Sequence, residues 1–218
     1  MDSSMEKENV AVNHVLYSII KRIFDIIVGL LGLIVLIPIS IIIKIISILS
    51  KDYAPIFYSH IRIGKNGKEF RLYKFRSMVP NADEVLKKLL KQRKYAEEWK
   101  KNQKLENDPR ITKIGKFLRK SSLDELPQFI NILKGDMSLI GPRPLLKGEL
   151  DEHNGNHEIY ESVRPGITGW WACNGRSATT YQKRLELEYY YINNMSLWLD
   201  IKCIFGTIVA VIGRKGAE

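Results

Sequence analysis

The feature that most constrains this chain is an uncharged, strongly apolar run over residues 26–43, bounded by Asp25 and Lys44. As a helix, its 18 residues would extend about 27 Å, near the lower limit for crossing a bilayer. Isoleucine and leucine fall on every face of such a helix, leaving no polar side for water. The run indicates a membrane segment, and a buried core helix is the alternative.

Pro38 lies inside this run and predicts a bend near residues 34–38, because proline removes a helical hydrogen bond and clashes with the preceding turn. We expect the Ser40 hydroxyl to satisfy a carbonyl that the bend frees. Positive charge tends to stay cytoplasmic, and it flanks the run on both sides, at Lys21, Arg22, Lys44 and Lys51. This favours a re-entrant helix over a single span. A cleaved signal peptide is a weaker alternative, because the run starts late and no small-x-small cleavage site follows.

The remaining sequence predicts an α+β fold that is mainly helical. Residues 56–75 predict a β-hairpin with its turn at 64–68, and residues 81–107 have the spacing of an amphipathic helix. A further helix is expected at about 114–119. Residues 196–212 are largely apolar but include Asp200 and Lys202, so we expect a helix on the membrane or domain surface.

The charge balance favours anionic partners. Lys and Arg number 34 against 24 Asp and Glu, a formal net charge of +10, which suits nucleic acid, anionic lipid or phosphorylated substrates. The basic residues lack interleaved aromatics and any known reader motif, so we do not expect nucleic acid. The two cysteines are 30 positions apart, which indicates neither a disulfide framework nor a zinc site.

The segment Ser122–Glu125 has the pattern of a capping box, with serine at the N-cap and glutamate three residues later. Such a signature is often only a helix start. A helix N-terminus also stabilises carboxylates and binds phosphate, and this one would present Asp124 beside Glu125. Basic residues lie on either side of it in the sequence, at Arg110, Lys113, Lys116, Arg119, Lys120, Lys134 and Arg143.

Arg143 lies between two prolines in Gly141–Pro144, where a fixed backbone would suit a bidentate phosphate clamp. A surface arginine in a tight turn is the alternative. Arg164 and Arg176 also stand beside rigid or glycine-rich backbone.

Taken together, these segments resemble the bacterial sugar transferases, also called monotopic phosphoglycosyl transferases. The resemblance covers about residues 20–217 and rests on ordered motifs: Lys21–Asp25 (KRIFD), Tyr73–Met78 (YKFRSM), Asn107–Thr112 (NDPRIT), Ser121–Gln128 (SSLDELPQ), Lys134–Pro144 (KGDMSLIGPRP) and Arg164–Gly169 (RPGITG).

The resemblance implies a two-step covalent reaction. Asp124 would attack a UDP-sugar and carry the phosphosugar while UMP is released, and polyprenyl phosphate would then accept it. Glu125, with Asp124, would hold Mg²⁺, which prefers one or two carboxylates plus substrate phosphates. The positions carried over as candidates for substrate binding are Lys74, Arg76, Arg110, Arg119, Arg143, Arg164, Gly166, Thr168 and Arg176.

The resemblance also implies an organisation and a location. We expect an interfacial segment over 1–20, a re-entrant helix over 21–50 and a catalytic domain over 51–218, embedded in the cytoplasmic leaflet of a bacterial membrane with the active site facing the cytosol. Two positions depart from the family pattern: Ile37 precedes Pro38 where relatives have serine, and Ala172 stands where they have glutamine.

The donor's identity stays open between a hexose and an amino sugar. The charged insertion over 79–107 and the C-terminal tail are more similar to the branch that uses UDP-galactose or UDP-glucose. A membrane-surface binding module without catalysis is the rival function. The sequence does not indicate an oligomeric state.

Overall fold

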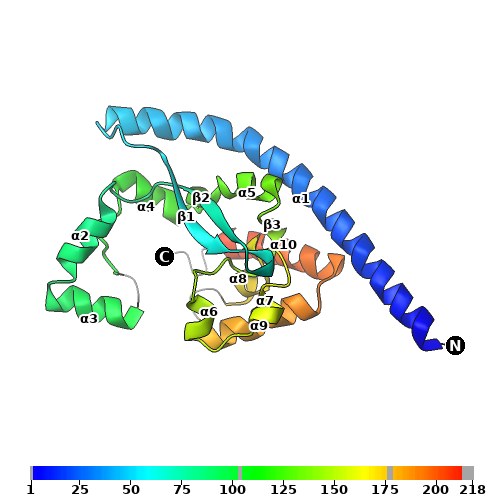
Figure 1. Cartoon of the computed structure of the whole chain (residues 1–218). Coiled ribbons are helices and arrows are strands. Elements are labelled where there is room, and N and C mark those ends of the chain that lie inside the picture. The colour runs from blue at the N-terminus through cyan, green and yellow to red at the C-terminus, as the bar shows by residue number, and fades with distance from the viewer. Residues whose placement is uncertain (1, 103–104, 176–178, 213–218) are drawn as a thin grey trace.

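A long helix, α1 (Asp2–Leu49), runs along one side of the other elements (Figure 1). The computed structural model describes residues 2–102, 105–175 and 179–212, and the side chains of 15–100, 105–175 and 179–210. The remaining elements are β1 (Phe57–Ile63), η1 (Lys65–Gly67), β2 (Glu69–Phe75), α2 (Ala82–Leu89), α3 (Arg93–Asn102), α4 (Lys113–Lys120), η2 (Leu123–Glu125), α5 (Gln128–Lys134), β3 (Ser138–Ile140), α6 (Glu149–Glu152), α7 (His157–Tyr160), β4 (Gly166–Thr168), α8 (Trp170–Asn174), α9 (Tyr181–Asn193) and α10 (Leu197–Ile212).

The apolar segment forms a helix that curves and is not interrupted at Pro38, and the re-entrant arrangement stays a prediction. Helical structure continues through Pro38 to Leu49, and α1 curves gently in Figure 1 without turning back. Ser40 Oγ donates a hydrogen bond of 2.7 Å to the Leu36 carbonyl. That carbonyl lies one turn before Ser40, whereas the missing N–H of Pro38 leaves the carbonyl of Ile34. Ser40 therefore bonds to a different carbonyl from the one the proline frees. The expected boundary between residues 20 and 21 also lies within continuous helix.

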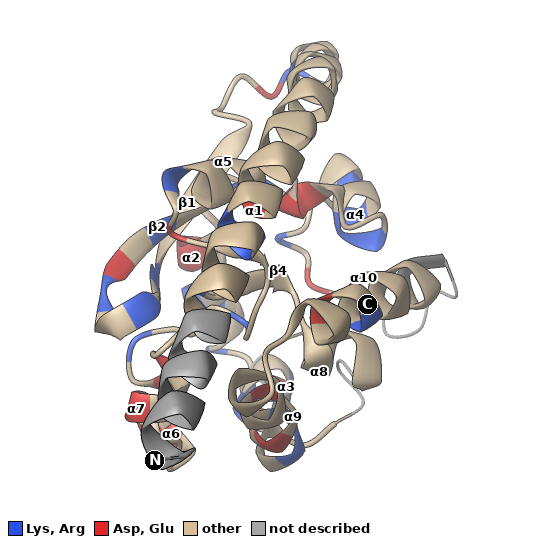
Figure 2. Ribbon diagram, turned by 90° about the vertical axis from the view of Figure 1, so that its right-hand side faces the viewer, with Lys and Arg blue, Asp and Glu red and all other residues tan. Residues whose placement is uncertain are grey.

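Part of α1 has the length and composition of a membrane segment. Val15–Leu49 is long and apolar enough to cross a bilayer, with a mean hydropathy of 3.1 in its most apolar window, of which 22% is buried in the protein. Figure 2 shows α1 tan, without charged residues, along most of its described length. Large apolar side chains on it remain exposed, at Ile23, Ile27, Leu30, Leu31, Ile34, Ile37, Ile41 and Ile45.

Three residues of the KRIFD motif fasten α1 to the rest of the fold. Lys21 forms an ion pair of 2.8 Å with Asp200 on α10. Arg22 donates hydrogen bonds of 2.7 and 2.9 Å to two carbonyls at the C-terminal end of α5, where helices leave carbonyls without partners. Asp25 is 2% exposed and accepts hydrogen bonds from the first two residues of β3. This motif therefore joins α1 to α5, β3 and α10.

Glycines let α1 approach α5 closely. A Cβ on Gly32 would overlap the ring of Phe129, and one on Gly29 would press on Leu133. Further along α1, Leu36 and Ile43 are buried in a cluster with Phe75 and Leu118. Packing thus extends from the KRIFD motif to near the C-terminal end of the helix.

The predicted hairpin and the helix expected at 114–119 are present, and the amphipathic stretch differs from expectation. β1 and β2 pair antiparallel with Phe57 opposite Phe75, around the turn at residues 64–68. The amphipathic stretch forms two helices, α2 and α3, because the helix ends after Leu89. The helix expected at 114–119 is α4, and Thr112 caps it by accepting a hydrogen bond from the Gly115 N–H.

A second sheet brings two of the glycine-containing motifs together. β3 and β4 pair in parallel, with Ser138 opposite Gly166 and Ile140 opposite Thr168. A Cβ on Gly166 would overlap the Gly141 backbone, as would one on Gly169. These glycines therefore permit the contact between the loop that carries Arg143 and the strand that carries Thr168.

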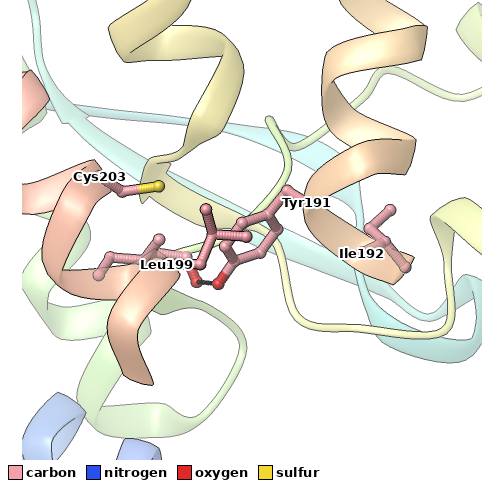
Figure 3. Packing of buried hydrophobic residues seen from close by; sticks show 5 residues of the cluster. Tyr191, Ile192, Leu199 and Cys203 are labelled. Atoms are coloured by element: carbon pink, nitrogen blue, oxygen red, sulfur yellow. Dashed lines mark hydrogen bonds between the residues drawn. The ribbon is translucent and has the colours of Figure 1, made fainter. Parts of the chain in front are cut away.

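The core next to this sheet is formed by α9 and α10. Tyr191, Leu199 and Cys203 are buried there with Ile140 and Ile192 (Figure 3). The Tyr191 hydroxyl donates to Asp200 at 2.6 Å. Asp200 thus bonds to both α1 and α9, which explains a carboxylate inside an apolar helix.

Candidate active site

Asp124 and Glu125 converge on one ammonium group. Lys74, on β2, donates a hydrogen bond of 2.8 Å to Glu125 Oε1, and its Nζ lies 3.5 Å from Asp124 Oδ2. Asp124 is 8% exposed. Burial raises the pKa of Asp124, against the opposing effect of Lys74, and the Glu125 charge adds to the increase. The site therefore holds a partly desolvated carboxylate beside a more exposed one.

The backbone here corrects the expected capping box. Ser122 adopts a left-handed conformation with φ 56°, and its side chain makes no capping hydrogen bond. The residues after it form a single 3₁₀ turn, η2, and α5 starts only after Pro127, whose fixed φ suits a helix start. The capping-box prediction was wrong, and Glu125 is held by Lys74 instead. The phosphate-binding helix N-terminus expected at Asp124 is also absent, because η2 has only three residues.

Two hollows meet at Lys74 and Glu125. The first, which we call the carboxylate hollow, has a volume of about 560 Å³. Its lining includes Asp124, Glu125, Lys74, His60, Arg76, Ser77, Met78, Arg119 and Ser122. The second, the arginine hollow, has a volume of about 520 Å³. Its lining includes Arg62, Arg143, Arg184, Glu188, Trp171, Thr168, Gly166, Gln128, His60, Lys74 and Glu125.

Arg119 and Arg76 line the carboxylate hollow but differ in what they can offer a ligand. Arg119 donates from Nε to Ser77 Oγ at 2.9 Å. Each of the three guanidinium nitrogens of Arg76 already donates within the protein, to Asp52 and to two backbone carbonyls. Arg76 thus braces the segment after α1, whereas Arg119 retains donors for a phosphate.

Arg143, Gly166 and Thr168 line the arginine hollow together. The backbone N–H of Arg143 donates to Glu188 at 3.0 Å, and its carbonyl accepts from the Tyr160 hydroxyl at 3.0 Å. Its guanidinium lies 6.0 Å from the centre of the Trp171 ring. Among the described residues it has no hydrogen bond or ion pair. The backbone around Arg143 is therefore held by Glu188 and Tyr160 as well as by the two prolines, and the phosphate clamp stays a prediction.

Two other predicted arginines lie outside both hollows. Arg110 is 5% exposed, forms a bidentate pair with Asp108 and lies over the ring of Trp99. Arg164 donates to the Gly135 carbonyl at 2.8 Å. Arg176 lies outside the described residues. Arg110 and Arg164 thus make contacts within the protein, and their part in substrate binding stays a prediction.

Sequence reasoning missed Arg62, Arg184 and Glu188. Arg62 follows His60 by two positions on β1 and so shares its face. Arg184 and Glu188 lie four apart on α9, within the buried stripe that includes Leu185 and Tyr191. Two charges inside an apolar helical stripe are the signal that could have identified Arg184 and Glu188, since buried charges need a partner or a function.

The carboxylate pair fits a magnesium ion. The described residues contain no group of three His, Cys, Asp or Glu side chains arranged to hold a metal. Mg²⁺ needs only one or two carboxylates when substrate phosphates supply other ligands. The Lys74 ammonium, touching Asp124 and Glu125, shows that their oxygens already converge on one positive charge.

Asp124 and Glu125, with Lys74 between them and Arg119 in the same hollow, form a candidate enzyme site in a chain that also carries a long apolar helix. The sequence profile described as bacterial sugar transferase matches residues 16–214. The chain belongs to the bacterial sugar transferase family, whose members are enzymes of the phosphoglycosyl transferase type.

Several curated relatives are similar over nearly the whole chain. The undecaprenyl-phosphate galactose phosphotransferase of Salmonella typhimurium is 46% identical over 201 residues, which cover 91% of this chain and 41% of the relative. The exopolysaccharide production protein ExoY of Sinorhizobium fredii is 43% identical, over 90% of this chain and 87% of the relative. An N-acetylgalactosaminephosphotransferase of Aeromonas hydrophila, whose name also includes undecaprenyl phosphate, is 36% identical over 93% of this chain and 46% of the relative. The chain thus spans less than half the length of the first and third of these relatives.

Proposed function

We propose that this chain transfers a sugar-1-phosphate, with a hexose as the favoured sugar, from a UDP-sugar to polyprenyl phosphate. The names of the relatives from Salmonella and Aeromonas support an undecaprenyl phosphate acceptor and a sugar-phosphate group. The observation that carries the proposal is the convergence of Asp124 and Glu125 on Lys74, where the two hollows meet. The reaction would be the first membrane step in making a polysaccharide or glycoconjugate.

The reaction proceeds in two displacements at one phosphorus atom. An Asp124 oxygen attacks the β-phosphorus of the UDP-sugar, and the bond between this phosphorus and the bridging oxygen breaks, so that UMP leaves with that oxygen. An oxygen of polyprenyl phosphate then attacks the same phosphorus and releases Asp124. The products are UMP and a polyprenyl diphosphate sugar.

The residues around Asp124 favour its attack on phosphorus. Burial removes water from Asp124, which strengthens its interaction with a phosphorus centre, while Lys74 favours its ionised form. Arg119 lies in the same hollow and offers guanidinium donors to phosphoryl oxygens. Mg²⁺, held by Glu125 with Asp124, would neutralise the donor's phosphates.

The packing of α1 supports a monotopic arrangement. Lys21 pairs with Asp200 near one end of the apolar segment, and Ile43 is buried near the other, so both ends lie against the same domain. These positions are separated by roughly 33 Å of helix at 1.5 Å per residue. A helix that crossed the whole bilayer could not keep both contacts with a domain on one side. We propose that α1 lies within the cytoplasmic leaflet, with its exposed isoleucines in lipid and the active site toward the cytosol.

Labelling of single cysteines tests this arrangement. In a chain with Cys173→Ala and Cys203→Ala, Ser4→Cys and Ser50→Cys would be placed at the two ends of α1. We expect a membrane-impermeant maleimide to label both positions in inverted vesicles and neither in intact cells. Labelling of the two positions from opposite sides would establish a span and overturn the monotopic arrangement.

Release of UMP tests the reaction. Full-length protein in detergent micelles would be given Mg²⁺, polyprenyl phosphate and a panel of UDP-hexoses and UDP-N-acetylhexosamines. We expect release with at least one sugar and none from Asp124→Asn. The panel also decides between a hexose and the amino sugar named in the Aeromonas relative. If Asp124→Asn binds vesicles normally and wild type releases no UMP with any sugar, a non-catalytic membrane-binding module replaces the proposed enzyme.

A further inference from the structure

Three arginines surround the arginine hollow with too few carboxylates to pair them. Arg62 comes from β1, Arg143 from the loop after β3 and Arg184 from α9. Glu149 is shared by two of them: it lies 3.3 Å from Arg184 and 3.7 Å from Arg62. Arg143 pairs with no acid among the described residues. The cluster thus has more positive charge than its own partners neutralise.

Several buried donors in this cluster have no acceptor. Arg184 is 5% exposed, yet its Nε and Nη2 lack hydrogen-bond partners, and so does Nε of Arg62. A buried donor without an acceptor destabilises the folded state, so native proteins rarely leave one unmet. Guanidinium donors converging on a hollow are suited to an anion with several oxygens, such as a phosphate group.

The other ionisable groups of the hollow do not cancel this charge. Burial raises the pKa of Glu188 to about 7, so that it carries only part of a negative charge near neutral pH. Burial and the neighbouring Arg62 lower the pKa of His60 to about 4, so His60 is neutral there. Lys74 and Glu125, at the junction with the carboxylate hollow, pair with each other. The arginine end of the hollow therefore remains positive.

The aromatic wall holds two guanidiniums in place. Arg184 lies 4.9 Å from the centre of the Trp171 ring and 4.9 Å from that of Tyr181, and Arg143 lies 6.0 Å from the Trp171 ring. Stacking on aromatic faces orients a guanidinium and leaves its in-plane donors free for an anion.

We propose that Arg62, Arg143 and Arg184 form a second phosphate subsite, separate from the Asp124–Glu125 pair, that binds a phosphate group of a substrate. Two phosphates have this chemistry: the nucleotide phosphate of the donor and the headgroup phosphate of the lipid acceptor. The identification of these two phosphates as ligands rests on the proposed function, whereas phosphate binding by the three arginines does not. The arginine hollow adjoins the carboxylate hollow at Lys74 and Glu125, so a phosphate held there lies next to the reacting one.

Equilibrium binding to the full chain in detergent micelles, without Mg²⁺, tests this subsite. Three probes are titrated separately: inorganic phosphate, UMP and a short-chain polyprenyl phosphate. We expect Arg62→Gln and Arg184→Gln each to weaken binding of at least one probe about tenfold or more, as expected for loss of a charged hydrogen bond. Arg71→Gln is the matched control, because Arg71 is exposed on β2 and lines neither hollow.

A variant with the opposite expected sign separates binding from folding. Glu149→Gln removes the acid shared by Arg62 and Arg184, so it should tighten phosphate binding severalfold, which structural damage would not do. If the arginine variants bind only UMP more weakly, the subsite belongs to the donor. If they bind only the polyprenyl phosphate more weakly, it belongs to the acceptor. Unchanged affinity for all probes in Arg62→Gln, or weaker binding in Glu149→Gln, overturns the proposal. These measurements involve no turnover, so they stand even if no UDP-sugar is consumed.

Discussion

Glu188 should make the stability of the folded chain depend on pH. Its side chain is 1% exposed, and burial raises its pKa from 4.5 to about 7. At 1.36 kcal/mol per pKa unit, this difference corresponds to about 3 kcal/mol. Because the folded state binds the proton more tightly, the stabilisation is complete below the unfolded pKa and is lost as pH rises through about 7.

The test compares wild type with Glu188→Gln by thermal unfolding in detergent micelles between pH 4.5 and 8. Glutamine can still accept the Arg143 N–H but does not titrate in this range. We expect wild type to lose about 3 kcal/mol relative to the variant across this range, roughly 6–12 °C in Tm for a chain of this size. Buffers should contain no phosphate, because an anion bound by the neighbouring arginines would itself change the pKa of Glu188 and the stability of the fold. A difference between the two proteins that stays constant with pH would refute the reasoning.

Two further predictions concern the site and the packing of α1. Lys74→Met removes the largest effect that lowers the pKa of Asp124, so the acid limb of single-turnover UMP release should move to higher pH. The exposed Lys68→Met should leave this limb unchanged, and an unmoved limb in Lys74→Met would contradict the role of Lys74. Gly32→Ala places a methyl group against the Phe129 ring and should destabilise the fold by about 1–3 kcal/mol in thermal unfolding. Leu31→Ala, at an exposed position, is its control, and equal Tm values for the two variants would show that α1 and α5 are not tightly packed.

Local sequence rules predicted the elements whose signals are local. The two-glycine turn at residues 64–68 correctly indicated the hairpin, and the helix expected at about 114–119 is α4. The capping box failed because Ser122 takes a left-handed conformation and Pro127 delays the next helix. A serine followed three residues later by glutamate does not determine the φ angle of the serine, and at Ser122 that angle is left-handed.

Long-range contacts account for the parts of the site that the sequence did not predict. Arg110 and Arg143 each follow a proline, so the sequence does not distinguish them. In the fold, Arg110 pairs with Asp108 and lies over the Trp99 ring, whereas Arg143 lines the arginine hollow. Arg62 and Arg184 line the same hollow although β1 and α9 are far apart in the chain. The contacts of α1 with α5, β3 and α10 are likewise long-range, and a hydropathy pattern does not contain them.

Asp124 is the proposed carrier of the phosphosugar, and intact-protein mass spectrometry can detect that adduct. Wild type would be mixed with Mg²⁺ and the UDP-sugar that supports UMP release, without acceptor, then quenched rapidly and digested to locate any adduct. We expect a gain of one sugar-phosphate mass on the peptide containing Asp124, lost when polyprenyl phosphate is added. Asp124→Asn should form no adduct, whereas the surface variant Asp151→Asn should behave as wild type. An adduct that persists in Asp124→Asn, or turnover by wild type with no adduct at Asp124, would contradict the account.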